Sequence, residues 1–359
     1  MKKLVVKSPG RVNIIGEHTD YALGYVMPAA VNLYTILEGA ASEVVKLESK
    51  VLKEVAEFDL STLARTGGWG DYVKGIYYAL GKRGIKAGGL EGIVSGNLPI
   101  GAGLGSSASL ELAVLYFLNQ VYSLGLSRIE MALIAKEAEN EFVGIPCGIL
   151  DQFSSSMGRR GHVIFLDTET LRYEYVPISG DTAIAVFYTG IKREIGKTAY
   201  RERRSAVEEG LRMLGVRSSK YLDSIDLAKL PMKHKRYLSY IVRENERVIK
   251  VRDLLKSGDV EAVGAVLVEA HRDLATNYGV SCPELDFIVR EAVRLGAYGA
   301  RLTGAGFGGS VIILASKDEV EFIAEGVLSS YVKEFPWSPK YFIVEASDGV
   351  KAVERIGGA

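Results

Sequence analysis

The feature that most constrains this chain is a glycine-rich stretch at residues 98–109, which reads LPIGAGLGSSAS. Its three glycines at alternate positions let the backbone approach a ligand closely, because no Cβ stands in the way. Bare amides that open into a helix N-terminus favour a polyphosphate, since the N–H groups and the helix dipole both attract negative charge. A flexible turn between two elements is the alternative that the stretch alone leaves open.

A helix is expected directly after this stretch. Ser106 and Ser107 can cap it, and their hydroxyls supply oxygen for a hard cation such as Mg²⁺. Apolar residues then recur on one helical face, at Leu110, Val114, Phe117, Leu118 and Val121.

The charge balance and the cysteine count exclude several classes of protein. Lys and Arg together number 44, as do Asp and Glu, which argues against a protein whose main task is to bind nucleic acid or anionic membrane. Two cysteines do not make a disulfide framework. The N-terminus has too few apolar residues for a signal peptide, and the uncharged residues 92–110 are too rich in Gly, Ser, Asn and Pro for a membrane span. We therefore expect a soluble cytoplasmic protein with no nucleic-acid or membrane partner.

The length of 359 residues allows two domains, and the character of the sequence changes near residue 180. We predict an N-terminal domain over residues 1–179 and a C-terminal domain over residues 180–359. Strands are expected in the second part at residues 182–189, 300–303, 311–315 and 341–345, with helices at 241–256, 260–277, 283–295 and 320–333. This β-α-β-β-α-β order is typical of a split, ferredoxin-like sheet. Residues 216–236 are expected to form a polar connector.

A strand is expected at residues 3–7, and a second polar segment follows it. This segment reads SPGRVNIIGEHTDY over residues 8–21. Glu17, His18 and Asp20 place two carboxylates and an imidazole within four positions. Such a cluster suits a polyhydroxylated ligand, because each group accepts from or bridges neighbouring hydroxyls. An ordinary surface turn remains an alternative, and one His with two carboxylates is a weak pattern for zinc.

A capping box at Ser127 and Glu130 predicts a further helix, with Met131, Ile134, Ala138 and Phe142 on its buried face. Glu139 and Glu141 lie on the two shoulders of that face, each about 80° from its centre. Either carboxylate can lean into a site and hold a cation. The helical pattern does not choose between them, and solvated charges are the simpler interpretation of each.

The stretch GIPCGILDQF at residues 144–153 places Asp151 just after a Pro/Gly turn, among apolar neighbours. A carboxylate in that position is a helix cap or a general base. Cys147 is interpreted as a small packed residue, because no histidine neighbours it in sequence.

Two other patterns carry weaker signals. The helical spacing over residues 70–80 makes Tyr72, Tyr77 and Tyr78 core or half-core residues, one of which can pack on a nucleotide base. The stretch GIKREIGKT at residues 190–198 looks like a phosphate-binding P-loop, but five residues separate its glycines where that loop needs four. We interpret it as a strand-to-helix connection.

Three segments together resemble the signature motifs of the GHMP superfamily of small-molecule kinases, which includes galactokinases and homoserine, mevalonate and phosphomevalonate kinases. They read PGRVNIIGEHTDY at 9–21, LPIGAGLGSSAS at 98–109 and LTGAGFGGS at 302–310. The first is similar to the galactokinase signature, as are PCGILDQF at 146–153 and VSCPELD at 280–286. Gly105 is a departure, since many galactokinases carry Ser there. The short length and the scarcity of Gln fit a compact, archaeal or thermophile-like form.

The resemblance implies an α+β fold with two domains, the N-terminal one like ribosomal protein S5 and the C-terminal one ferredoxin-like, with the site between them. It also implies residue roles. Asp151 is the catalytic base and Arg11 its partner, and Mg²⁺ lies between Ser107 and Glu139, which selects Glu139 over Glu141. The ATP phosphates bind Gly101, Ala102, Gly103, Leu104, Gly105, Ser106 and Ser107. The sugar binds Glu17, His18, Thr19, Asp20, Gly148, Asp151 and Tyr200.

The implied reaction transfers the γ-phosphoryl group of ATP to the C1 hydroxyl of α-D-galactose. Two alternatives stay open: a kinase for N-acetylgalactosamine or a related sugar, and a non-catalytic galactose sensor. An intact glycine loop together with Arg11 and Asp151 favours an enzyme. A monomer and a homodimer are both compatible with the sequence.

Overall fold

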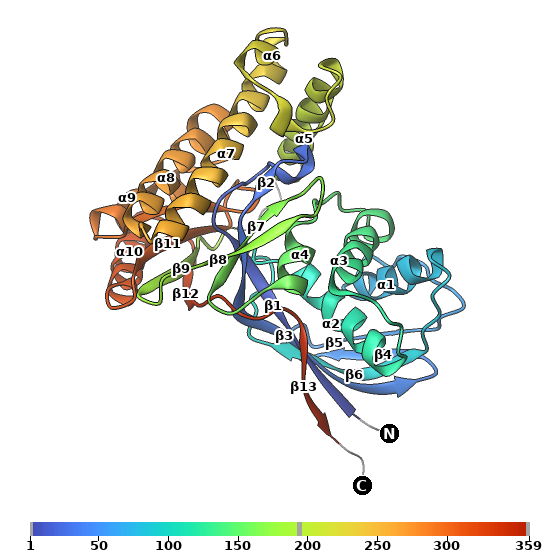
Figure 1. Ribbon diagram of the computed structural model, residues 1–359. Coiled ribbons are helices and arrows are strands. Elements are labelled where there is room, and N and C mark those ends of the chain that lie inside the picture. The colour runs from blue at the N-terminus through green and yellow to red at the C-terminus, as the bar shows by residue number, and fades with distance from the viewer. Residues whose placement is uncertain (1–2, 192–195, 357–359) are drawn as a thin grey trace.

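The computed structural model describes residues 3–191 and 196–356, which form two α+β domains in close contact (Figure 1). The N-terminal domain is built on a six-stranded sheet in the order β13-β1-β3-β6-β4-β5. Its strands are β1 (Lys3–Asn13), β3 (Pro28–Ser42), β4 (Val45–Ser49), β5 (Glu54–Phe58), β6 (Gly89–Gly96) and β13 (Lys351–Ile356). The β4–β6 pair is parallel, and the other pairs are antiparallel.

Four helices pack with this sheet; the first three share one apolar core with it, and the fourth buries its apolar residues in a smaller core (Figure 1). They are α1 (Gly70–Lys82), α2 (Ser106–Val121), α3 (Arg128–Glu137) and α4 (Leu150–Met157). The predicted capping box is present at the start of α3, with Ser127 and Glu130 each bonded to the other's backbone N–H. The predicted apolar faces are largely buried: Phe117 and Leu118 of α2, and Met131 and Ile134 of α3, are at most 1% exposed, whereas Leu110 and Val121 are only partly buried.

A small antiparallel sheet continues the domain, with β2 (Tyr25–Val26), β7 (His162–Asp167) and β8 (Tyr173–Pro177) in that order. The chain then enters the C-terminal sheet, whose order is β10-β11-β9-β12. Its strands are β9 (Thr182–Tyr188), β10 (Gly299–Thr303), β11 (Ser310–Ser316) and β12 (Lys340–Val344), all paired antiparallel. This order is that of the ferredoxin-like fold, so the predicted β-α-β-β-α-β pattern is confirmed.

Six helices accompany the C-terminal sheet. They are α5 (Gly196–Met213), α6 (Ser224–Ala228), α7 (Met232–Ser257), α8 (Val260–Asp273), α9 (Pro283–Arg294) and α10 (Val320–Glu334). Helices α7 to α10 lie next to one another beside the sheet (Figure 1). The expected polar connector at 216–236 is shorter than predicted, because α6 and the first residues of α7 lie inside it.

Strand β9 explains why the two domains form a continuous body. Alternate side chains of a strand point to opposite faces. Ala183, Ala185 and Phe187 therefore pack into the core under the C-terminal helices. Ile184 and Val186 face the other way, into a second core shared with N-terminal residues such as Met27. The cleft that holds the site lies beside this shared core.

In the N-terminal part the sequence also predicts strands at residues 3–7, 24–30, 32–37, 44–47, 55–60 and 90–95, but it did not predict β7, β8 or β13. Strand β13 returns to the first sheet and pairs with β1, so residues 351–356 follow the C-terminal domain in sequence but extend the N-terminal sheet. Both ends of the described chain are therefore close together (Figure 1). In the stretch interpreted as a strand-to-helix connection, residues 192–195 lie outside the described residues; β9 precedes it and α5 begins at Gly196. Among the described helices, none combines the length and the apolar character needed to cross a bilayer.

Candidate active site

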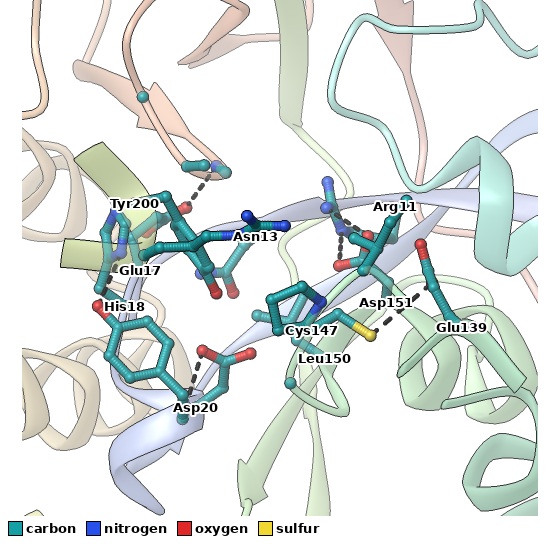
Figure 2. A pocket seen from close by; sticks show the side chains of 18 residues that line it. Arg11, Asn13, Glu17, His18, Asp20, Glu139, Cys147, Leu150, Asp151 and Tyr200 are labelled. Carbon is teal, nitrogen blue, oxygen red and sulfur yellow. Dashed lines mark hydrogen bonds and ion pairs between the residues drawn. The ribbon is translucent and has the colours of Figure 1, made fainter. Parts of the chain in front are cut away.

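A pocket of about 420 Å³ lies where β1, the turn after it, residues 139–151, the first turns of α5 and the loop at 304–306 meet. Most of the residues predicted for the site line it: Arg11, Glu17, His18, Asp20, Glu139, Gly148, Asp151 and Tyr200. Figure 2 shows two groups in this pocket, with Glu17, His18, Asp20 and Tyr200 at one end and Arg11, Asp151 and Glu139 at the other.

The glycine loop at 101–105 adopts the backbone that its sequence predicts. Gly101, Gly103 and Gly105 have φ angles of 81°, 76° and 71°, in the left-handed region that favours glycine. Gly105 is the residue that caps α2, and no side chain accepts a hydrogen bond there. The expected cap by Ser106 or Ser107 is therefore wrong, because both serines lie inside the first helical turn. The amides of that turn consequently have no side-chain cap, as an anion site at a helix N-terminus requires.

Arg11 and Asp151 form a bidentate ion pair at the edge of this loop. Arg11 Nε and Nη2 each donate to one carboxylate oxygen of Asp151, both at 2.7 Å. Arg11 Nη1 also contacts the carbonyl oxygen of Gly103, and the Arg11 backbone N–H donates to Leu104. The arginine is thus tied to the glycine loop by its side chain and its backbone. Asp151 keeps 29% of its side chain exposed and faces the pocket, so its remaining lone pairs can accept a further hydrogen bond.

The local winding of the chain separates Glu139 from Glu141. Helix α3 ends at Glu137, and residues Ala138–Val143 continue as a π-helix. Glu139 is 6% exposed and lines the pocket. Glu141 points out to an exposed ion pair with Lys82 at 2.6 Å. Glu139 and Glu141, whose positions are equivalent on an ideal helix, therefore differ in the folded chain, and only Glu139 reaches the site.

The hydrogen-bond partners of the Glu139 carboxylate are neutral side chains. Gln152 donates its amide to Glu139 Oε2 at 2.7 Å, and the Cys147 sulfur lies 3.8 Å from the same oxygen. Burial raises the pKa of Glu139 to about 7, helped by the charge of Asp151 and opposed by a hydrogen bond from Ser107 and by Arg11. A buried carboxylate without a close cationic partner among the described residues is suited to bind a cation. Ser107 supplies a hydroxyl oxygen beside it.

At the other end of the pocket, His18 has a free ring nitrogen. His18 Nδ1 lies 3.0 Å from the Tyr21 hydroxyl, whereas Nε2 is buried with no hydrogen-bond partner among the described residues. Burial lowers the pKa of His18 to about 3, so the ring is neutral at physiological pH. A neutral imidazole with a free nitrogen can exchange a hydrogen bond with a ligand hydroxyl.

Asp20 and Gly148 are in direct contact across the pocket. Asp20 accepts the backbone N–H of Tyr21 at 2.9 Å. Its pKa is raised by burial, an effect that the Tyr21 N–H opposes. A Cβ added at Gly148 would lie 1.7 Å from Asp20 Oδ2. Because Gly148 has no side chain, the Asp20 carboxylate has room to lie there.

Tyr200 and Thr19 occupy different positions. The Tyr200 ring, from α5, lies 5.7 Å from the rings of His18 and Tyr21 and closes the pocket on that side. Thr19 is fully buried, and its hydroxyl donates to the carbonyl oxygens of Gly16 and Tyr25. Thr19 is absent from the lining of this pocket and instead holds the turn that carries Glu17, His18 and Asp20.

Glu17 reaches the pocket from a buried ion pair. Its carboxylate contacts Arg301 and accepts the Gly304 backbone N–H at 3.3 Å. Burial raises the pKa of Glu17 to about 7, and the charge of Arg301 opposes that rise. Each oxygen of the Glu17 carboxylate already has a partner, but the remaining lone pairs can accept one further hydrogen bond.

Asn13, Cys147 and the loop at 304–306 also line the pocket, although the sequence analysis gave them no role in the site. Asn13 is 1% exposed, and its side chain interacts with the Glu17 carboxylate. It lies between the two ends of the pocket (Figure 2). An asparagine inside a buried β-strand was a signal that could have identified it. Cys147, expected to be packed, is only half-buried and borders the pocket.

A second, smaller pocket of about 140 Å³ adjoins the glycine loop and is lined by Ser106 and Ser107. Its other walls include the aromatic residues Trp69 and Tyr72 and the apolar residues Leu52 and Ile100. Of the three tyrosines considered from the sequence, Tyr72 is the one that lies here. Tyr77 is buried in the N-terminal core.

Fold and site together define a small-molecule kinase of the GHMP class. The family model described as the GHMP kinases N terminal domain matches residues 71–159, and that for the GHMP kinases C terminal domain matches residues 251–333. The solved structure of a mevalonate kinase from Methanococcus jannaschii has the same fold, with a TM-score of 0.69, 21% identity, and coverage of 96% of this chain and 98% of the other.

Within that class, the model of the galactokinase galactose-binding signature matches residues 1–41. A galactokinase of Thermococcus kodakarensis is 58% identical over 96% of this chain and 99% of its own length, and one of Pyrococcus furiosus is 55% identical over 98% and 99%. The crystal structure of Lactococcus lactis galactokinase complexed with galactose matches with a TM-score of 0.93 and 31% identity, covering 98% of this chain and 95% of that one. The chain belongs to the galactokinase family.

Proposed function

We propose that this protein transfers the γ-phosphoryl group of ATP to the C1 hydroxyl of α-D-galactose and releases galactose 1-phosphate and ADP. The observation that carries the proposal is the pocket itself. An Arg11–Asp151 pair tied to an uncapped glycine loop lies at one end, and a cluster of hydroxyl-binding groups lies at the other. A phosphoryl donor and a polyhydroxylated acceptor would therefore meet beside Asp151.

In this mechanism Asp151 accepts the proton of the C1 hydroxyl as that oxygen attacks the γ-phosphorus. Arg11 keeps the carboxylate oriented through its two hydrogen bonds and places positive charge next to the transferred group. Positioning and electrostatic stabilisation supply most of the rate enhancement in phosphoryl transfer. The base is expected to contribute about 10²–10⁴-fold.

The acceptor end of the pocket supports a hexose with several hydroxyls. We assign Glu17 and His18 to the C6 hydroxyl and Asp20 to the O3 and O4 pair, with Tyr200 and the Gly148 backbone beside the ring. His18 Nε2 and the spare lone pairs of Glu17 and Asp20 are the groups left free for these contacts. Thr19 acts indirectly, because its hydroxyl is committed to two backbone carbonyls.

ATP is assigned to the glycine loop and the small pocket next to it. The amides of Gly101–Ser107 bind the phosphates. The base lies in the pocket with Trp69 and Tyr72, since aromatic and apolar walls suit a planar ring. The pocket begins at Ser106 and Ser107, which connects the two parts of the nucleotide site.

Mg²⁺ is assigned to Ser107 and Glu139. Among the described residues, no group of three or more His, Cys, Asp or Glu side chains is arranged to hold a metal. Mg²⁺ typically needs only one or two protein oxygens, because substrate phosphates and water complete its coordination. When bound, the ion neutralises phosphate charge. The buried Glu139 carboxylate, whose hydrogen-bond partners are neutral, fits that role. We also propose that the enzyme is cytoplasmic and acts as a monomer or homodimer; the balanced charge composition argues against nucleic acid as a partner.

The Mg²⁺ requirement should depend on pH through Glu139. The carboxyl group has a pKa of about 7 without the ion, and a proton competes with Mg²⁺ for it. Apparent Mg²⁺ affinity should therefore increase with pH, by about fivefold between pH 6 and pH 7 and by at most about twofold above pH 7. The measurement is the protection of the protein from heat by ADP as free Mg²⁺ is varied. Glu139→Gln should bind the ion weakly at every pH, with only the pH dependence of the nucleotide itself.

The experiment that tests the proposed function is ADP release from ATP and Mg²⁺ with a panel of sugars. Galactose should be the best acceptor, with its 1-phosphate as the product. Faster turnover of N-acetylgalactosamine would favour the kinase for that sugar. If ADP release fails with every sugar while galactose still stabilises the protein against heat, the protein is a sensor and the proposed function is wrong.

A further inference from the structure

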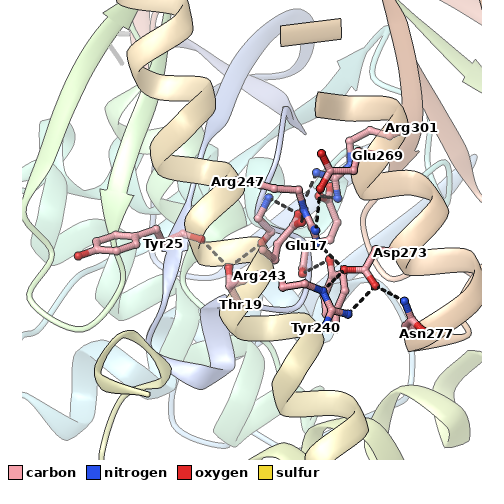
Figure 3. Close-up of polar contacts among 12 residues, drawn as sticks. Glu17, Thr19, Tyr25, Tyr240, Arg243, Arg247, Glu269, Asp273, Asn277 and Arg301 are labelled. Carbon is pink, nitrogen blue, oxygen red and sulfur yellow. Dashed lines mark hydrogen bonds and ion pairs between the residues drawn. The ribbon is translucent and has the colours of Figure 1, made fainter. Parts of the chain in front are cut away.

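A chain of alternating charges runs from the sugar end of the pocket into the C-terminal helices (Figure 3). Glu17 pairs with Arg301, which donates from Nη1 to Glu244 Oε1 at 2.9 Å. Glu244 Oε2 accepts from Arg247 at 2.8 Å, and Arg247 donates to Asp273 at 2.9 Å. Glu17 comes from the N-terminal domain, whereas the other charged residues of this chain of ion pairs come from β10, α7 and α8.

The inner part of this chain is withdrawn from water. Arg301 and Glu244 are both 0% exposed, and Glu17 is 3% exposed. Buried ionised groups are costly unless they are paired and hydrogen-bonded. Each of these charges is paired: Arg301 contacts two carboxylates, and Glu244 contacts two arginines. The fully buried arginine thus sets where the Glu17 carboxylate can lie.

The same elements also hold the backbone around Glu17. The Gly16 N–H donates to Glu244 Oε1 at 2.9 Å, and the Tyr240 hydroxyl donates to the Glu17 carbonyl oxygen at 3.0 Å. The Gly304 N–H, three residues after Arg301, donates to the other Glu17 carboxylate oxygen. The side chain and the main chain of Glu17 are therefore both positioned from the C-terminal domain.

We propose that Arg301 is a positioning residue for sugar recognition: braced by Glu244, it fixes the Glu17 carboxylate where the substrate C6 hydroxyl binds. This inference rests on the proposed function, because it takes Glu17 as a ligand of that hydroxyl. The charge of Arg301 also favours the ionised carboxylate, because it opposes the pKa rise that burial causes. Its guanidinium contacts both carboxylates at once, which a lysine ammonium does less well.

The test compares galactose with 6-deoxygalactose, which lacks only the C6 hydroxyl. A site built to bind a hydroxyl rejects an analogue without it, so the wild-type ratio of kcat/KM for the two sugars should be large. Arg301→Met should lower that ratio by at least about tenfold, mainly through a higher galactose KM, with the KM for ATP within about twofold. Arg301→Lys should lower the ratio less, because lysine keeps the positive charge but lacks the planar guanidinium that contacts both carboxylates.

Arg243→Gln is the matched control. Arg243 lies at the outer end of the same chain, is 43% exposed, and pairs with Asp273, which Arg247 also contacts. Its loss should leave the sugar ratio unchanged. An unchanged ratio in folded Arg301→Met overturns the inference, as does an equal fall in Arg243→Gln. If Arg301→Met does not fold, an unchanged ratio in Arg301→Lys has the same consequence.

The Glu17→Gln variant distinguishes a failure of this inference from a failure of the proposed function. If the wild type does not phosphorylate galactose, the proposed function fails. If the wild type is active but Glu17→Gln keeps the ratio, Glu17 does not bind the C6 hydroxyl and the inference fails with that assignment. If Glu17→Gln lowers the ratio and Arg301→Met does not, only the role of Arg301 is wrong.

Discussion

Replacing Asp151 with asparagine is expected to lower kcat by at least about 100-fold while galactose binding stays close to that of the wild type. Asparagine keeps the size of the side chain and one oxygen that accepts from Arg11, but its amide cannot take the proton of the C1 hydroxyl. The loss should therefore appear in the chemical step. The measurement is kcat from ADP release, with galactose affinity measured separately by calorimetry.

Glu141→Gln is a suitable control, because this carboxylate lies ten residues earlier and faces solvent in an ion pair with Lys82. It should leave kcat and affinity within about twofold of the wild type. Thermal melts of the Asp151→Asn protein check that Arg11, which is 7% exposed, still has enough partners for folding. Near-normal turnover by a folded Asp151→Asn protein would remove Asp151 from the role of base.

Local sequence patterns predicted the elements that depend on local physics. The capping box at Ser127 and Glu130 and the apolar face after residue 106 both lie where the structure has α3 and α2. The glycines of the 101–105 loop have the left-handed φ angles that the motif requires. These features follow from hydrogen bonds and sterics among residues close in sequence, which periodicity and spacing can detect.

The pattern failed where the backbone departs from ideal geometry. A helical wheel at 100° per residue placed Glu139 and Glu141 symmetrically, whereas the π-helix at Ala138–Val143 turns the chain differently and buries only Glu139. The expected serine cap failed for a related reason, since Gly105 itself occupies the capping position. In both cases the residue types alone do not decide where the side chain lies.

Contacts between distant segments were out of reach of the sequence patterns. Strand β13 pairs with β1 although nearly the whole chain separates them, and its six residues carry no signal for that partner. Arg301 meets Glu17 from the other domain in the same way. The one local hint was an arginine inside an otherwise apolar strand, GARLT, where burial requires a charged partner. The pattern indicates that a partner exists but not which residue it is.

Asp20→Ala is expected to lower the preference for galactose over glucose by about 10²-fold or more. The two sugars differ only in the orientation of the C4 hydroxyl, which we assign to Asp20. A buried carboxylate aimed at the axial hydroxyl is left without its donor when the epimer binds, and that cost is what produces the discrimination. The measurement is kcat/KM for both sugars at saturating ATP. If the preference survives unchanged, Asp20 does not recognise O4.

Gly148→Ala sharpens this test because it moves the same carboxylate without removing it. The added Cβ would lie 1.7 Å from Asp20 Oδ2, so the side chain must shift. Displacement of a positioning group by about 1 Å can cost on the order of 10²-fold. We expect the galactose KM to rise and the preference over glucose to fall, with the KM for ATP unchanged. If the position of the Asp20 carboxylate determines selectivity, both variants should lose preference for galactose over glucose. If only Asp20→Ala loses that preference, the charge of the carboxylate is recognised and its position is not.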